Sequence, residues 1–262
     1  MSNDTTPLAT VSTHETYLSG GIPSVASLDR NPLDQFSKWF KHAQSRSDDV
    51  PEPEAMAIST VSSTGIPSTR VVLLKQVDPR GFVFYSNYTS RKGKELFPAG
   101  FDGANPQGGY VSCAFYWRTL HLSVRVVGRA EKVDAETTKA YFNSRPVGSR
   151  IGAWASEQSA VLTSGTREEL EEKVKAVERR FGVPEGTATG QASAVDVGPA
   201  TTGAASQVSD VDIPVPPFWG GVRIVPFEVE FWAGRESRLH DRYQYSRPEG
   251  SDGEWQVDRL NP

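Results

Sequence analysis

Short turns between strand-like segments constrain this fold more than any other feature of the sequence. Residues 63–67 (Ser-Thr-Gly-Ile-Pro) and 78–81 (Asp-Pro-Arg-Gly) each separate two runs of alternating or β-branched residues. The predicted strands of this first half are residues 55–62, 68–77, 82–85, 110–117 and 120–130. Such spacing favours an antiparallel meander that closes into a barrel or sandwich. A parallel nucleotide-binding fold is not expected, because the chain has no GxGxxG or Walker motif.

Helices flank these strands, so we predict a mainly β fold of the α+β class. Asn31 and Pro32 open a helix over 32–45, Asp134 caps one over 135–143, and the Thr166–Glu169 capping box opens a third. Further strands are predicted at 222–232, 239–245 and 255–260. We interpret residues 16–262 as one domain.

Two segments lack the composition of a packed structure. Residues 1–15 are polar, and we expect a disordered N-terminal tail. Residues 185–210 contain no aromatic residue, Leu, Ile, Met, Lys or Arg. Because such a stretch cannot bury enough apolar surface to offset its ordering entropy, we predict a disordered insertion.

Charge and residue counts exclude several functional classes. Lys and Arg number 28 against 32 Asp and Glu, a net charge of −4, so no overall basic field attracts nucleic acid. One cysteine and four scattered histidines argue against disulfides and metal sites. The N-terminal residues lack the pattern of a secretory signal and no apolar run is long enough to span a membrane, so we expect neither a signal nor a membrane span. We expect a cytoplasmic protein with no membrane or nucleic-acid partner.

The first cluster of basic residues follows a predicted strand. Ser90, Arg91 and Lys92 supply hydroxyl, guanidinium and ammonium donors in succession, which suits a phosphate monoester. On this tripeptide alone, an exposed basic loop is the favoured interpretation. Arg70 and Lys75 precede it, and their odd spacing puts them on opposite faces of a strand unless a bulge intervenes.

The second cluster joins a phenol, a guanidinium and a hydroxyl. Tyr141, Arg145 and Ser149 recur every four residues, and one helical face would align them for phosphate binding. Pro146, however, predicts that a helix ends at Arg145. A helix terminus with an exposed arginine is an equally good interpretation of the spacing.

The third cluster is Arg238-Leu-His-Asp-Arg242. On a strand, Arg238, His240 and Arg242 would share one face. Two neighbouring cations would hold the imidazole neutral and favour an anionic or electron-rich ligand. His240 is therefore a candidate active-site residue.

Together these clusters resemble the pyridoxine (pyridoxamine) 5′-phosphate oxidase family. The resemblance covers residues 17–262 and rests on many separated segments in the same order. They are 17–21, 31–36, 70–75, 84–87, 90–92, 141–142, 144–146, 149, 151–156, 158–159, 218–221, 230–232, 238–242 and 258–262.

The resemblance implies an FMN-binding split β-barrel, working as a homodimer with two FMN sites at the subunit interface. Its implied reaction oxidises pyridoxine or pyridoxamine 5′-phosphate to pyridoxal 5′-phosphate, by hydride transfer from C4′ of the substrate to N5 of the flavin. Oxygen then reoxidises the flavin and yields hydrogen peroxide. The protein contributes mainly orientation and electrostatics.

By similarity, three groups of residues carry these roles. The implied FMN-binding residues are Arg70, Val71, Val72, Leu73, Lys75, Tyr85, Ser86, Arg91, Lys92, Ser123, Gln158, Ser159, Trp232 and Arg242. The implied substrate-binding residues are Lys75, Tyr141, Arg145, Ser149, Arg238, Leu239 and His240. Of these, Arg238 and His240 are the catalytic candidates over the substrate ring, where a fixed guanidinium can stabilise developing charge.

One position departs from the family pattern. Family members usually have glutamine where this chain has Ser123, within Leu122-Ser-Val124. A hydroxyl is shorter than an amide and makes fewer hydrogen bonds, so we predict weaker FMN retention with the chemistry largely kept. A non-catalytic protein that carries FMN or pyridoxal phosphate is the alternative hypothesis, and a flavin split-barrel reductase with another substrate is a weaker one.

Overall fold

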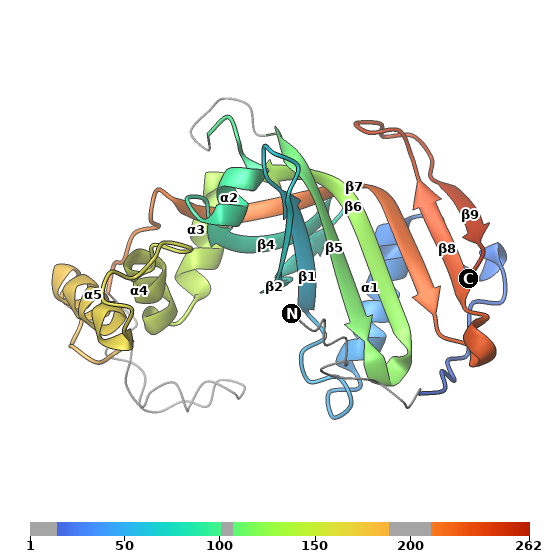
Figure 1. Cartoon of the computed structure of the whole chain (residues 1–262), viewed down its shortest axis with the longest axis horizontal. Coiled ribbons are helices and arrows are strands. Elements are labelled where there is room, and N and C mark those ends of the chain that lie inside the picture. Colours follow the sequence, from blue (N-terminus) through green and yellow to red (C-terminus); the bar gives the residue numbers. More distant parts are fainter. Residues whose placement is uncertain (1–14, 101–106, 189–210) are drawn as a thin grey trace, which may run out of the picture. The chain divides into compact units, whose positions relative to one another are not determined.

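A computed structural model describes residues 15–100, 107–188 and 211–262. These residues form two compact units, each built from separate stretches of the chain. Figure 1 shows the helices and strands, coloured by their place in the sequence. We call residues 54–113 and 126–227 the central unit, and residues 1–53, 114–125 and 228–262 the terminal unit. The predicted N-terminal tail, except Glu15, and most of the predicted 185–210 insertion lie outside the described residues.

Nine strands and five α-helices make up the described fold. The strands are β1 (Ala55–Val61), β2 (Pro67–Leu73), β3 (Gln76–Asp78), β4 (Gly81–Asn87), β5 (Gln107–Trp117), β6 (Leu122–Lys132), β7 (Trp219–Ala233), β8 (Asp241–Ser246) and β9 (Gln256–Leu260). The α-helices are α1 (Pro32–Gln44), α2 (Arg91–Leu96), α3 (Ala135–Ser144), α4 (Val147–Ala155) and α5 (Arg167–Arg180). Short 3₁₀ helices are η1 (Val25–Ser27), η2 (Arg118–Leu120) and η4 (Glu236–Arg238).

The strand order is β2-β1-β5-β6-β7-β4-β3, with β8 and β9 off this path. β1 pairs antiparallel with β2, β3 with β4, and β4 with β7. The first strand of this path also lies against β4 near its other end, so the sheet curves back toward itself. The predicted antiparallel, mainly β architecture is confirmed.

Burial follows the strand periodicity. β1 alternates, with Met56, Ile58 and Thr60 on its buried face, as expected for a strand with one face in the core. β4 is buried on both faces because it is an inner strand covered on each side. Gly128 allows a close approach here, since a Cβ at this position would lie 2.4 Å from the carbonyl oxygen of Val225.

The helices α3, α4 and α5 pack together in the central unit. Their shared core includes Phe142, Ile151, Ala153 and Val174. At the end of α5, Glu178 is fully buried and accepts hydrogen bonds from two backbone N–H groups within residues 186–188. This carboxylate therefore fixes the chain where it leaves the helix.

The terminal unit is built on α1 and the strand ends. Asn31 caps α1 by accepting from the N–H of Leu33 at 2.9 Å, with Pro32 in the first turn, as predicted. Phe36, fully buried, packs against Phe115 and Trp117 at centroid distances of 4.9 and 6.0 Å. β8 pairs antiparallel with both β7 and β9.

Three local predictions are wrong. The expected strand over 68–77 is two strands, because the chain changes partner: Leu74 N–H bonds to Glu54, whereas Lys75 N–H bonds to Val83. The residues that follow Ser90 begin helix α2 rather than a loop, with the Ser90 hydroxyl accepting from a backbone N–H in its first turn.

The third error concerns the segment before β8. Arg238 lies in η4 and His240 in the following connection, so they do not share a strand face with Arg242. Separately, no helix in the described residues is long and apolar enough to span a membrane.

Candidate functional site

A cavity of about 560 Å³ lies within the central unit, and most of the predicted site residues line it. Its lining consists of Ser68, Thr69, Arg70, Val71, Val72, Leu73, Lys75, Tyr85, Ser86, Arg91, Lys92, Tyr141, Arg145, Gln158, Ser159 and Trp219. This lining contains five cationic side chains and no carboxylate. An anion is the ligand that such a wall attracts.

Lys92 is the most buried of these cations. Its ammonium group donates to the Ser86 hydroxyl at 3.0 Å and to Gln158 Oε1 at 2.5 Å, and it is only 7 % exposed. Burial, with a smaller contribution from the charge of Arg70, lowers the pKa of Lys92 to about 8. Its hydrogen-bond partners among the described residues are neutral, so dipoles alone solvate the ammonium charge.

An aromatic stack forms another wall of the cavity. The rings of Tyr85 and Tyr141 stack at 3.8 Å between centroids, and Tyr85 also stacks on Trp219 at 5.3 Å. The guanidinium of Arg145 lies 4.9 Å from the centroid of Trp219. Burial raises the pKa of both tyrosines, so the phenols stay neutral and can donate hydrogen bonds.

Arg145 carries an unsatisfied donor at this cavity. Its Nη1 atom is buried and has no hydrogen-bond partner among the described residues. Burial lowers the pKa of this guanidinium from its ordinary value, yet an arginine remains charged. A buried polar group of this kind calls for a ligand or solvent partner.

The structure separates Ser149 from Tyr141 and Arg145. α3 ends at Ser144 and α4 begins at Val147, so the three residues do not follow one helical face. Ser149 is exposed and does not line the cavity. The break at Pro146 agrees with the sequence prediction for this position.

A second pocket, of about 520 Å³, lies within the terminal unit. It contains the predicted residues Ser123, Trp232 and Arg242, and its other lining residues are Tyr17, Tyr116, Arg125, Glu230 and Pro262. The Ser123 hydroxyl donates to the carbonyl oxygen of Phe115 at 2.9 Å. Its proton is therefore committed to the backbone, and the oxygen can only accept from a ligand.

A buried carboxylate organises this second pocket. Glu230 accepts from Arg242 Nε at 2.7 Å and from Arg125 Nη2 at 2.9 Å. Burial alone would raise the pKa of the Glu230 carboxyl, but hydrogen bonds and charges from the two arginines lower it overall. The two guanidinium groups are thus held in fixed orientations.

His240 and Trp232 form a second aromatic group with Tyr17. The imidazole lies 4.7 Å from Trp232 and 5.5 Å from Tyr17, measured between ring centroids. His240 Nδ1 accepts from the backbone N–H of Arg235 at 3.1 Å, so the neutral ring carries its proton on Nε2. Burial first, and the charge of Arg238 second, lower the pKa of His240, in the predicted direction.

Arg238 itself is exposed, with a φ of 62° next to Ser237 at 55°. Its side chain makes no hydrogen bond or ion pair with the described part of the chain. Leu239 lines a separate pocket with Tyr17 and Arg235.

Sequence reasoning did not single out Trp219 as a cation partner, nor Arg125 and Glu230. Trp219 enters the sequence analysis only within the segment 218–221, and no local pattern indicates that Arg145 lies on its ring face. Glu230 is 105 positions from Arg125. The one local indication for Glu230 is that it lies two residues from Glu228 and from Trp232 on a single strand. This spacing places the acid beside an aromatic residue on one face.

Two family models match the chain. Residues 44–180 match the model described as pyridoxamine 5′-phosphate oxidase, and residues 219–262 match the pyridoxine 5′-phosphate oxidase C-terminal dimerisation region.

Curated relatives match over nearly their full length. A pyridoxine/pyridoxamine 5′-phosphate oxidase of Paraburkholderia phytofirmans is 44 % identical over 242 residues, which is 92 % of this chain and 94 % of the relative. One of Bordetella avium is 46 % identical over 231 residues, 88 % of this chain and 89 % of the relative.

Solved structures share the fold. PhzG from Burkholderia lata, in complex with tetrahydrophenazine-1-carboxylic acid, has a TM-score of 0.70 and 27 % identity, and the match covers 92 % of this chain and 97 % of PhzG. A pyridoxamine 5′-phosphate oxidase-related, FMN-binding protein of Nostoc punctiforme has a TM-score of 0.55 at 14 % identity, with 87 % and 97 % covered. The fold is that of the split-barrel proteins of this family.

Proposed function

The chain belongs to the pyridoxine/pyridoxamine 5′-phosphate oxidase family, and from this premise we propose that it is an FMN-dependent oxidase of pyridoxine 5′-phosphate and pyridoxamine 5′-phosphate. The product is pyridoxal 5′-phosphate, with molecular oxygen as the final electron acceptor and hydrogen peroxide released. The observation that carries this proposal is the cavity of the central unit, whose lining has five cations and no carboxylate.

The donors of that cavity fit the phosphate of FMN. Lys92 is buried beside Ser86 and Gln158 and has no acidic hydrogen-bond partner in the described part of the chain, and a phosphate would supply the missing charge. Arg91 adds a guanidinium that can bind two phosphate oxygens at once. When bound, FMN would supply the electron-accepting chemistry of the oxidation.

A second set of donors fits the phosphate of the substrate. Arg145 offers its unsatisfied Nη1, Tyr141 a neutral phenol, and Lys75 an exposed ammonium group. Trp219 lies under the guanidinium of Arg145 and limits its rotation. Ser149, which the resemblance adds to this set, stays a prediction.

Arg238 and His240 are our candidates for orienting the reacting carbon of the substrate. The neutral imidazole would donate from Nε2, and the fixed positive charge of Arg238 would stabilise negative charge that develops on the substrate. Neither role requires titration of the group near neutral pH.

We further propose that the active form is a homodimer, supported by the match of residues 219–262 to the dimerisation region of the family. The resemblance implies that residues of both subunits contribute to each site. The cavity of the central unit and the pocket of the terminal unit hold separate subsets of the implied residues, which is compatible with that arrangement.

The test is to purify the protein, identify bound flavin spectroscopically, and add pyridoxine 5′-phosphate in air. Aldehyde and hydrogen peroxide should appear in equal amounts, and unphosphorylated pyridoxine should react far more slowly. Flavin binding without either product would favour the non-catalytic carrier. Equal turnover of the phosphorylated and unphosphorylated vitamers would instead point away from a phosphate-binding substrate site.

A further inference from the structure

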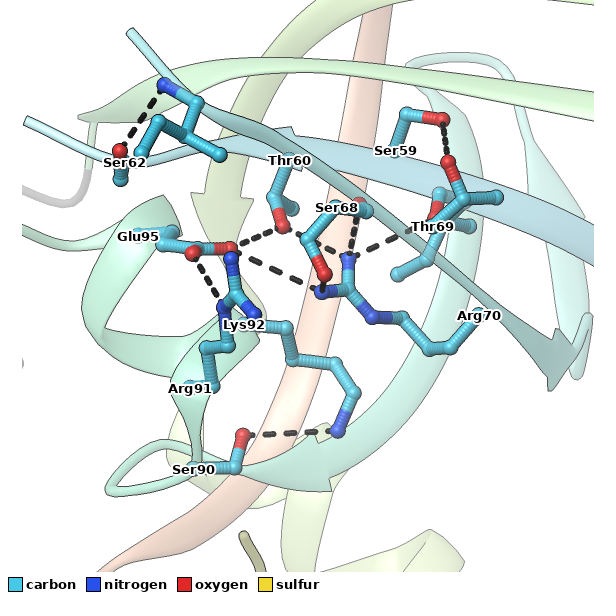
Figure 2. A network of polar contacts seen from close by, with 12 residues as sticks. Ser59, Thr60, Ser62, Ser68, Thr69, Arg70, Ser90, Arg91, Lys92 and Glu95 are labelled. Carbon is cyan, nitrogen blue, oxygen red and sulfur yellow. Dashed lines mark hydrogen bonds and ion pairs between the residues drawn. The ribbon is translucent and has the colours of Figure 1, made fainter. Parts of the chain in front are cut away.

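A network of polar side chains adjoins the cavity, and its members Ser68, Arg70 and Arg91 line it (Figure 2). Thr60, on the buried face of β1, is fully buried, and its hydroxyl accepts from Arg70 Nη1 at 2.6 Å. The same hydroxyl donates to Glu95 Oε2. Glu95 Oε1 accepts from Arg91 Nε at 2.8 Å. The network therefore runs from the strand core to an arginine of the cavity lining.

Arg70 is committed to this network. Its Nη1 also donates to the carbonyl oxygen of Ser68 and its Nη2 to the Ser68 hydroxyl, both at 2.8 Å. Arg70 Nη2 and Glu95 Oε2 are 3.7 Å apart, too far for a hydrogen bond. The Thr60 hydroxyl closes this gap because a single oxygen can accept from a guanidinium and donate to a carboxylate.

Glu95 is the acid that holds Arg91. Its side chain is 8 % exposed. Burial alone would raise its pKa, but hydrogen bonds from Thr60 and Arg91 and the charges of Arg91 and Arg70 lower the pKa overall, so the carboxylate stays ionised. The two Nη groups of Arg91 bond to none of the residues that the structure describes, and they remain available to an anion.

We propose that Thr60 is a positioning residue for the phosphate-binding wall, acting through Glu95 on Arg91. This inference rests on the proposed function, in which Arg91 binds the phosphate of FMN. Arg70 lines the same cavity, and both of its Nη groups also donate within this network, so it anchors the Thr60 hydroxyl as well. Without the hydroxyl, Glu95 loses a fixed partner and Arg91 gains freedom that phosphate binding must then restrict.

The experiment compares FMN with riboflavin, which lacks the phosphate, on flavin-free full-length protein. Thr60→Val keeps the size of the side chain and leaves it uncharged, but removes the hydroxyl. We expect the Kd of FMN to rise about fivefold, the worth of one hydrogen bond in a buried network. The Kd of riboflavin should stay the same, and Thr60→Ser should restore the affinity for FMN.

Thr138→Val is the matched control, because Thr138 is also buried but its hydroxyl has no hydrogen-bond partner among the described residues. This variant should leave both dissociation constants unchanged. In an Arg91→Met background, Thr60→Val should have no further effect on FMN, since the hydroxyl acts through that arginine.

The possible outcomes distinguish a failure of the proposed phosphate site from a failure of the role proposed for Thr60. If the wild-type protein binds FMN no more tightly than riboflavin, the proposed phosphate site is wrong. If the wild type discriminates and folded Thr60→Val keeps the same ratio, Thr60 is a purely structural residue and the inference fails. Should Thr60→Val not fold, Thr60→Ala removes the hydroxyl without placing a methyl group against Glu95, and the same ratio decides.

Discussion

At the scale of one residue, Lys92 illustrates how a group positioned for ligand binding lowers the stability of the folded protein. Its ammonium group is buried among neutral partners, and its pKa falls to about 8. The unfolded chain therefore binds more protons than the folded one between about pH 8 and the ordinary lysine value, and stability rises with pH across that window. Below pH 8 the full cost of the buried charge is present, and a bound phosphate would offset it.

The same pKa predicts how FMN binding depends on pH. Phosphate binds the charged form of Lys92, so the Kd of FMN should rise above about pH 8, by at most about tenfold per pH unit. Titrations at pH 7 to 10 with FMN and riboflavin measure this, and the riboflavin affinity should not follow the same curve. In Lys92→Arg the charge does not titrate, so a rise that persists in this variant would contradict the assignment.

At the position of Ser123 the family resemblance implies a glutamine. Its hydroxyl donates to the Phe115 carbonyl, so its proton is already used. Ser123→Gln should extend an amide into the pocket and tighten FMN binding about fivefold, the worth of one added hydrogen bond. Retention of flavin during dialysis measures the effect, and Ser123→Ala should bring no gain. Weaker retention in Ser123→Gln would mean that the pocket has no room for the amide.

At the scale of elements, the sequence predicts what local patterns determine. The helix predicted over residues 32–45, with Asn31 as its cap, is observed at Pro32–Gln44. α4 was missed because Gly148 and Gly152 weaken its helical propensity, and packing of Ile151 and Ala153 against the other helices stabilises it instead. The break between β2 and β3 was missed because an extended run does not reveal a change of pairing partner.

The candidate site shows the same limit. Short motifs single out Arg91, Lys92 and Arg145 as candidates, since donors that are adjacent or one turn apart are visible in a linear pattern. Exposed positions explain the same spacings equally well or better, and only the family resemblance selects a binding site. The pair of Arg125 and Glu230 and the face of Trp219 under Arg145 depend on tertiary contacts across long stretches of chain, so no local spacing indicates them.

The prediction about turnover concerns Arg238, which lies in the connection between β7 and β8. Ser237 and Arg238 both have left-handed backbone conformations, which cost about 1–3 kcal/mol each for residues other than glycine and are often retained where function requires them. We expect Arg238→Leu to lower kcat about a hundredfold, the typical effect of removing one group that stabilises developing charge. The Kd of FMN should change less than threefold. Steady-state kinetics and flavin titration measure the two separately.

Arg167→Leu, on the exposed face of α5, controls for the loss of one positive charge. It should leave both quantities unchanged. An equal loss of turnover and of flavin affinity in Arg238→Leu would mean that this arginine supports the flavin site and not the reacting carbon.

At the scale of the whole molecule, the residues that the family resemblance implies for one site are divided between the two units. Tyr141, Arg145 and Lys92 belong to the central unit, whereas His240 and Arg238 belong to the terminal unit. A symmetric dimer repeats every contact, so a site that takes one set from each subunit occurs twice. This arrangement, implied by the family resemblance, can be tested by measuring the activity of mixed dimers.

Mixing two inactive variants should restore activity. An Arg145→Leu chain and an Arg238→Leu chain, co-expressed in equal amounts with different tags, form mixed dimers in about half of the population. If each site takes Arg145 from one subunit and Arg238 from the other, one of the two sites in a mixed dimer keeps both arginines. The mixture should then show about one quarter of the wild-type activity, and purified mixed dimers about one half. Activity no higher than that of the separate variants would mean that a single subunit supplies both arginines to its own site.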